Sequence, residues 1–185
     1  MKDMKMILKL SVTLLLICTF VAGALAGVNA ITEDRIAALL AEKTQKALAE
    51  VLPGAGELTV VDFADESGIV KTVYAAAGKG YAIEVAPAGF GGAITMMVGV
   101  DESCKVIGIS IVSHTETASL GAVAADKGSA GVSFREQFKG QTLGMAVGQQ
   151  IDAITGATIT SKAVTDGVNA ALAAAEQLIK GGAAK

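Results

Sequence analysis

Residues 10–28 form a run without a charged side chain, and no other segment limits the possible architectures of this chain as strongly. At about 1.5 Å per residue, a helix of this run would span roughly 28 Å, close to the hydrocarbon thickness of a bilayer. Three lysines precede the run, whereas Glu33 and Asp34 follow it. By the positive-inside rule we expect a single-pass protein of the inner or plasma membrane, with a cytoplasmic N-terminus and an extracytoplasmic C-terminal domain. The expected boundary separates an anchor, residues 1–29, from a domain, residues 30–185.

A cleavable signal peptide is the alternative interpretation of the same run. The tripeptide Ala24-Leu25-Ala26 has the small-x-small form of a cleavage site. The run is longer than the apolar core of a typical signal peptide, which favours a retained anchor. Under either interpretation, the domain that follows is exported.

Composition narrows the class of protein. The chain has 185 residues, enough for one domain, and it is 52% hydrophobic and only 18% charged, so part of it is expected to contact lipid. It has no Trp and a formal net charge of -3, which argues against a nucleic-acid-binding protein. The two cysteines, Cys18 in the apolar run and Cys104 in a polar turn, are not placed to form a disulfide, and no metal site is expected.

The exported part of the chain has the pattern of an α+β domain with an antiparallel sheet and flanking helices. Helical spacing predicts a helix over 31–52, separated from the anchor by a short break and capped by Thr32, and a second helix over 160–180. Short β-rich segments between turn signals predict strands over 58–63, 69–76, 81–86, 93–100 and 105–113, with a weaker candidate over 143–147. In the fifth strand Ile107, Ile109 and Ile111 alternate with other residues, so all three are expected on one face of the sheet.

The segment 152–158 is a hydroxyl-rich turn that leads directly into the last helix. Such a turn offers free backbone N–H groups and the positive end of a helix dipole, which together suit a phosphate. Gly156 permits close approach of the backbone, and Thr160 and Ser161 are candidates for capping the helix or bonding phosphate oxygens. A simple helix-capping turn without a ligand is the alternative.

Two further segments carry chemistry-bearing residues. Residues 113–121 follow the fifth strand and contain the only histidine, but a Ser/His hydrolase is disfavoured because no Gly-x-Ser-x-Gly motif occurs. One histidine with scattered carboxylates is equally weak support for a metal site, and a connecting loop without a role is the simplest alternative. The glycine-rich segments 78–81 and 89–92 lack the third glycine of a dinucleotide motif, although the glycines would make room for a flat ring.

Taken together, these segments resemble the FMN-binding domain of the G subunit of the Rnf complex, a membrane ferredoxin:NAD oxidoreductase that translocates Na⁺ or H⁺. The residues that carry the resemblance are Gly80-Tyr81, Met96-Met97-Val98-Gly99-Val100-Asp101, Lys105-Val106-Ile107-Gly108, His114-Thr115-Glu116-Thr117, Leu120-Gly121 and Asp152-Ala153-Ile154-Thr155-Gly156-Ala157-Thr158. The last of these is similar to the covalent-flavin attachment signature Asp-x-x-(Ser/Thr)-Gly-Ala-Thr. The family's loop usually reads Glu-Thr-Pro-Gly-Leu-Gly, and this chain departs from it with Ala118-Ser119.

The resemblance implies an electron-carrying subunit rather than an independent catalyst. It implies FMN joined to Thr158 through a phosphoester by a flavinyltransferase after export, and the other membrane subunits of the complex as partners. The implied cofactor-binding residues are Thr158 with Asp152, Thr155, Gly156, Ala157, Thr160 and Ser161, and, in the loop, Glu116, Thr117, Leu120 and Gly121.

Other functions stay open at this point. The C subunit of the Na⁺-translocating NADH:quinone reductase shares the domain and is usually longer. A stand-alone flavinylated carrier for extracellular electron transfer would have the same motif, and an exported interaction domain without a cofactor is the third alternative.

Overall fold

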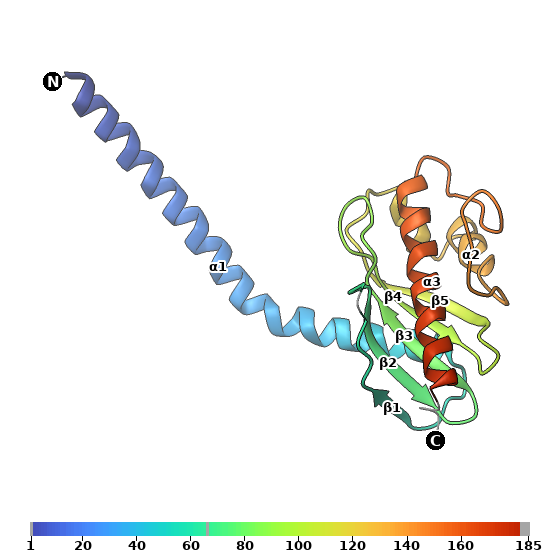
Figure 1. Cartoon of the computed structure of the whole chain (residues 1–185). Helices are drawn as coiled ribbons and strands as arrows, with labels where there is room; N and C mark the ends of the chain where they lie inside the picture. The colour runs from blue at the N-terminus through green and yellow to red at the C-terminus, as the bar shows by residue number, and fades with distance from the viewer. Residues whose placement is uncertain (1, 66, 182–185) are drawn as a thin grey trace. The chain divides into compact units, whose positions relative to one another are not determined.

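In the computed structural model, which describes residues 2–65 and 67–181, the chain separates into two compact units, Met1–Glu42 and Lys43–Lys185 (Figure 1). The first unit is a single stretch of helix, and the second holds the sheet and the remaining helices. The α+β class, with one apolar N-terminal helix, an antiparallel sheet and flanking helices, is confirmed. The predicted domain boundary at residue 30 falls within the first helix.

Helix α1 (Lys2–Val51) is long and apolar enough to cross a membrane. Within the first unit its described side chains are exposed, apart from that of Thr32, which is half-buried. The predicted break before residue 31 is wrong, since the helix is continuous. Thr32 is not an N-cap either. Its hydroxyl donates to the carbonyl of Val28 at 2.9 Å, one turn earlier in the same helix.

The sheet contains five antiparallel strands in the order β1-β2-β3-β4-β5. The strands are β1 (Leu58–Val61), β2 (Val70–Ala76), β3 (Gly80–Val85), β4 (Thr95–Val100) and β5 (Val106–Ser113). All five predicted strands are present, and their ends differ from the prediction by one or two residues. Each strand is joined to the next in sequence by a connection of turns and loops, so the sheet is a simple meander.

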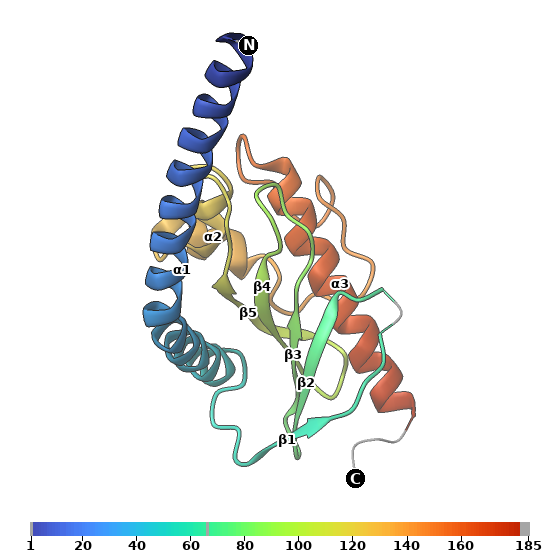
Figure 2. The same cartoon turned by 90° about the vertical axis from the view of Figure 1, so that its left-hand side faces the viewer.

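Helix α3 (Thr158–Lys180) packs across one face of the sheet, and Figure 2 shows it lying over the strands. Val164, Val168 and Leu172 are fully buried on this face. The other face is covered by the last turns of α1, through Leu48 and Val51. Because the buried side chains of α3 pack on the sheet, the N-terminus of α3 is held at a fixed place beside the sheet.

The prediction of one isoleucine face in β5 is wrong. The pairing of β4 with β5 shifts between Gly99 and Val100, and Ile107 is the extra residue in β5. Ile109 and Ile111 pack on the α3 side, whereas Ile107 packs with Val51 and its neighbours on the α1 side. A bulge of this kind reverses the side-chain alternation and leaves no trace in the sequence pattern.

Two short helices follow β5, and the sequence pattern did not predict them. They are the 3-10 helix η1 (Gly121–Ala125) and the α-helix α2 (Ser129–Glu136). The weak strand predicted over 143–147 is absent. There the backbone N–H groups of Gly144 and Met145 donate to the Asn169 side chain of α3, which in turn donates to the Met145 carbonyl. A side-chain amide thus replaces the sheet partner that a strand would need.

Candidate functional site

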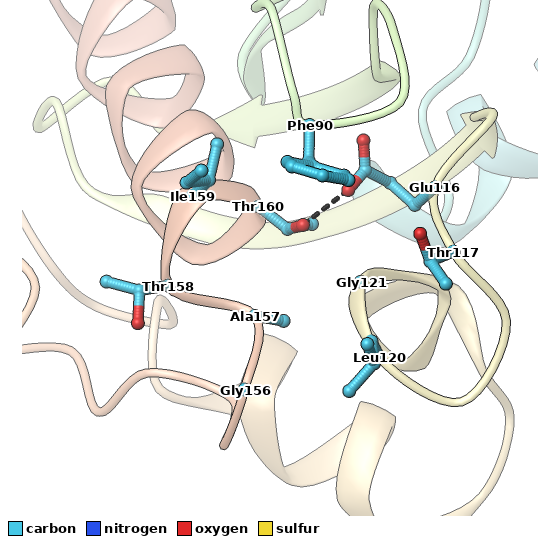
Figure 3. Close-up of a pocket in the computed structure, with 10 residues that line it drawn as sticks. All are labelled: Phe90, Glu116, Thr117, Leu120, Gly121, Gly156, Ala157, Thr158, Ile159 and Thr160. Carbon is cyan, nitrogen blue, oxygen red and sulfur yellow. Dashed lines mark hydrogen bonds between the residues drawn. The ribbon is translucent and has the colours of Figure 1, made fainter.

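Three segments that are far apart in the sequence surround one cavity of about 340 Å³ (Figure 3). They are the connection between β3 and β4, the loop that follows β5, and the turn that enters α3. The residues that line the cavity are Phe90, Glu116, Thr117, Leu120, Gly121, Gly156, Ala157, Thr158, Ile159 and Thr160. The fold therefore brings the hydroxyl-rich turn and the histidine-containing loop to the same place.

The start of α3 presents free backbone donors to this cavity. Ala157 is the N-cap, and no side chain caps the helix. The first bond inside the helix runs from the Ser161 N–H to the Ala157 carbonyl at 2.9 Å. Within the described residues, the N–H groups of Thr158, Ile159 and Thr160 donate to no acceptor. Uncapped N–H groups combined with the positive end of a 23-residue helix favour an anion.

Thr158 lies at the edge of the cavity with an exposed side chain. In Figure 3 its hydroxyl points away from the Glu116 carboxylate. Among the described residues the Thr158 hydroxyl has no hydrogen-bond partner. Gly156, two residues before Thr158, has φ of 76°, a left-handed conformation that favours glycine. A Cβ atom at Gly156 would lie 3.1 Å from Cδ2 of Leu120, so the turn and the loop pack closely.

Thr160 and Ser161 do not cap the helix, because each has another hydrogen-bond partner. The buried Thr160 hydroxyl donates to the Glu116 carboxylate. The buried Ser161 hydroxyl donates to the Ala157 carbonyl at 3.0 Å and accepts the N–H of Ile154 at 3.0 Å. Ser161 lies outside the cavity lining and instead fixes the shape of the turn.

Asp152 and Thr155 also lie outside the cavity lining, with exposed side chains. The backbone of Asp152 is held by the Gln137 side chain, which accepts its N–H at 2.7 Å and donates to its carbonyl at 3.3 Å. The predicted motif therefore divides into two parts. Gly156, Ala157 and Thr158 line the cavity, and the earlier residues approach it along the surface.

Glu116 is the most buried charged residue of the site, with 9% of its surface exposed. One carboxylate oxygen accepts the Gly91 N–H at 2.9 Å, and the other accepts the Thr160 hydroxyl. The neighbouring Thr115 hydroxyl donates to the Gly91 carbonyl at 2.9 Å. The Glu116 N–H donates to Nδ1 of His114 at 3.3 Å, and this bond holds the imidazole ring against the backbone of its own loop.

The departure of the loop from the Pro-Gly pattern leaves a tight turn intact. The Leu120 N–H donates to the Thr117 carbonyl at 3.2 Å, and Ser119 has φ of 63°. A positive φ at the third residue is typical of a type II turn, whose usual residues are proline and then glycine. Ala118 and Ser119 occupy these two positions.

Three large apolar side chains stand exposed around the cavity. Phe90 is 68% exposed, Leu120 43% and Ile159 54%. Sequence reasoning placed Leu120 at the site but missed Phe90 and Ile159. The signal for Phe90 was present in Gly89-Phe90-Gly91-Gly92, since a lone aromatic residue among glycines has no strand or helix pattern to explain it.

Comparisons with known proteins match two families along this chain. The family described as the FMN-binding domain matches residues 89–173, and the family described as the RnfG N-terminal region matches residues 1–51. The chain is similar to the G subunit of the Na(+)-translocating ferredoxin:NAD(+) oxidoreductase complex of Acetobacterium woodii, with 32% identity over 96% of each chain. It is 30% identical to the G subunit of the ion-translocating oxidoreductase complex of Methanosarcina acetivorans, over 93% of this chain and 96% of the relative. The G subunit of the proton-translocating ferredoxin:NAD(+) oxidoreductase complex of Clostridium ljungdahlii is 44% identical over 50% of this chain and 51% of its own.

Proposed function

We propose that this chain, which belongs to the family of G subunits of ion-translocating oxidoreductase complexes, binds FMN covalently through Thr158 and carries electrons within such a complex. One observation carries the proposal. The turn that enters α3 and the loop after β5, which are about 40 residues apart in sequence, line the same cavity with Thr158 at its edge. A helix-capping turn without a ligand would need no such cavity.

The residues present fit FMN. The cavity of about 340 Å³ is within the size range of small-molecule sites, which is roughly 300–1,000 Å³. Phe90, Leu120 and Ile159 supply exposed apolar surface for a flat ring. The free N–H groups at the start of α3 supply donors for a phosphate. The ring and the phosphate of FMN are thus each matched by a distinct part of the cavity.

When bound, FMN would supply the redox chemistry, and the protein supplies binding, orientation and electrostatics. We assign attachment to the Thr158 hydroxyl, and phosphate binding to the N–H groups of Ile159 and Thr160. Phe90 and Leu120 would exclude water from the ring. Thr117, whose side chain is exposed at the cavity, would offer its hydroxyl to a polar edge of the cofactor.

We further propose that a flavinyltransferase attaches FMN after export and folding. The Thr158 hydroxyl is exposed and has no hydrogen-bond partner among the described residues, so a second protein can reach it without unfolding the domain. The test is expression with and without a flavinyltransferase. We expect a band that fluoresces under ultraviolet light on a denaturing gel only when the enzyme is present, and none for Thr158→Ala. A fluorescent band without the enzyme would contradict this route.

We propose that the chain is anchored by α1 with its N-terminus in the cytoplasm, beside the other membrane subunits of its complex. The uncharged residues 10–28 and the charges that flank them support this orientation. A single cysteine at the exposed position Thr142, in a chain without Cys18 and Cys104, should react with a membrane-impermeant maleimide in intact cells or spheroplasts. Reaction only after lysis would contradict the orientation, and N-terminal sequencing would reveal cleavage after Ala26.

A further inference from the structure

Glu116 is the point at which all three segments of the cavity wall are joined. Glu116 belongs to the loop after β5, and its carboxylate accepts the Gly91 N–H from the β3–β4 connection. The carboxylate also accepts the Thr160 hydroxyl from α3, the bond drawn in Figure 3. Both carboxylate oxygens are therefore bonded to the protein. A carboxylate with both oxygens occupied in this way is placed to hold segments together.

The surrounding glycines show how closely the chain is packed around this carboxylate. A Cβ atom at Gly89 would overlap one Glu116 oxygen, and a Cβ atom at Gly121 would overlap the other oxygen together with the Thr160 hydroxyl. Gly91 is held through both of its backbone groups, because Glu116 accepts its N–H and Thr115 donates to its carbonyl. Phe90, which lies between Gly89 and Gly91, is exposed, but the backbone that follows it is held at Gly91.

We propose that Glu116 is a positioning residue that fixes Phe90 at the cavity by tying the β3–β4 connection to the first turn of α3. The proposal rests on the proposed FMN site, because Phe90 matters there as the wall for the ring. The hydrogen bonds of Glu116 carry this role, and its negative charge is not required for it.

Three substitutions at this position separate the bonds from the charge. Glu116→Gln removes the charge but keeps both bonds, since its carbonyl oxygen can accept the Gly91 N–H and its amide can donate to the Thr160 hydroxyl. Glu116→Asp keeps the charge, but it is one methylene too short to reach both partners. Glu116→Ala removes the charge and the bonds together.

The chain contains no tryptophan, so Phe90→Trp introduces a single reporter at the position in question. Phe90 is 68% exposed, and the larger ring can be accommodated there. The measurement is the fluorescence anisotropy of this tryptophan in the full-length chain, solubilised in detergent and free of FMN. We expect Glu116→Gln to retain the anisotropy of the parent, and Glu116→Asp and Glu116→Ala to lose it to a similar extent.

Thr160→Val keeps the test decisive if Glu116→Ala fails to fold. It removes the bond between Thr160 and Glu116, and Thr165→Val is its matched control. Thr165 is a buried threonine of the same helix, and its hydroxyl donates to the Ser161 carbonyl at 2.9 Å, away from Glu116. We expect the anisotropy of the reporter to fall in Thr160→Val and to stay unchanged in Thr165→Val.

A second readout uses the loaded protein with Phe90 in place. The emission of attached FMN should change in the same direction in Glu116→Asp and Glu116→Ala, and should change less in Glu116→Gln. The positioning role is overturned if Glu116→Gln loses the anisotropy as fully as Glu116→Ala, or if Thr160→Val behaves like Thr165→Val. Failure of FMN to attach even in wild type would instead contradict the proposed function, and the anisotropy comparison would still decide the role of Glu116.

Discussion

The turn before α3 and the loop after β5 face each other across the cavity, and each contains one residue in the left-handed conformation. The turn uses Gly156, with φ of 76°, and the loop uses Ser119, with φ of 63°. Glycine adopts this conformation without steric cost, whereas for other residues the cost is about 1–2 kcal/mol. The same backbone requirement is therefore met without strain on one side and with strain on the other.

The two residues also differ in their surroundings. Gly156 packs against Leu120 of the opposite loop, while Ser119 is exposed. A side chain at Gly156 is thus opposed by both the backbone conformation and the available space, and at Ser119 only the conformation is unfavourable. The turn is therefore the more tightly specified half of the site, and the loop tolerates substitution at a modest cost in stability.

The largest effect is expected from Gly156→Ala, which places a Cβ atom in the strained conformation and 3.1 Å from the Leu120 side chain. The positive φ alone should cost about 0.5–1 kcal/mol once the lower unfolded-state entropy of alanine is counted, and the contact with Leu120 should add to this loss. Urea unfolding of the detergent-solubilised chain, followed by near-ultraviolet circular dichroism, measures this loss. FMN attachment should also slow, because Thr158 is two residues away.

Gly140→Ala is the matched control for that prediction. Gly140 has φ of 72°, and a Cβ atom there would have no atom within 4 Å. Gly140→Ala therefore incurs the cost of the positive φ without a contact like that with Leu120, and Gly140 lies outside the cavity lining. If the two variants lose equal stability and attach FMN equally well, the packing of the turn against Leu120 is unimportant and the contrast between turn and loop is reduced.

An intermediate effect is expected from Thr117→Val, which tests whether the loop touches the cofactor at all. Losing one hydrogen bond typically costs about 1 kcal/mol, and for a one-electron step 1.4 kcal/mol corresponds to about 59 mV. We therefore expect the midpoint potential of bound FMN to shift by tens of millivolts, with attachment at Thr158 intact. Spectroelectrochemical titration measures this potential, with Thr142→Val as control, because Thr142 is exposed and outside the cavity lining. A potential identical to that of wild type would make the loop a connector only.

The smallest effect is expected from Ser119→Gly, which should stabilise the protein. Removing the left-handed cost of about 1–2 kcal/mol is partly offset by the greater unfolded-state entropy of glycine, about 0.5–1 kcal/mol. The net gain should be about 0.5–1 kcal/mol, measured by the same urea unfolding. A loss of stability would show that the Ser119 side chain makes a favourable contribution that the contrast with Gly156 overlooks.

The sequence predicted the elements whose signals are local. The uncharged run identified the apolar helix, and alternation between turn residues identified all five strands. Helix α2 was missed because only Gly131 and Phe134 of its residues are buried, too few to produce helical periodicity. The bulge at Ile107 was missed because it arises from the pairing of β4 with β5, which no single-strand pattern records.

The site was predicted in part, for similar reasons. The resemblance placed Thr158 and Leu120 among the cofactor-binding residues, and the fold brings them to one cavity. It could not separate Asp152 and Thr155, which lie outside the lining, from the residues that face the cavity. The segment around Phe90 showed no strand or helix pattern, but its place at the cavity depends on hydrogen bonds between Gly91 and the distant residues Thr115 and Glu116.

The central claim is that Thr158 carries FMN, and peptide mass spectrometry tests it most directly. The measurement is fragmentation of the peptide that contains the four hydroxyl residues Thr155, Thr158, Thr160 and Ser161, from protein expressed with a flavinyltransferase. Fragment ions should place one FMN phosphoester on Thr158, and the adduct should be absent from Thr158→Ala and present in Thr155→Ala. An adduct on another hydroxyl, or one that persists in Thr158→Ala, would contradict the account.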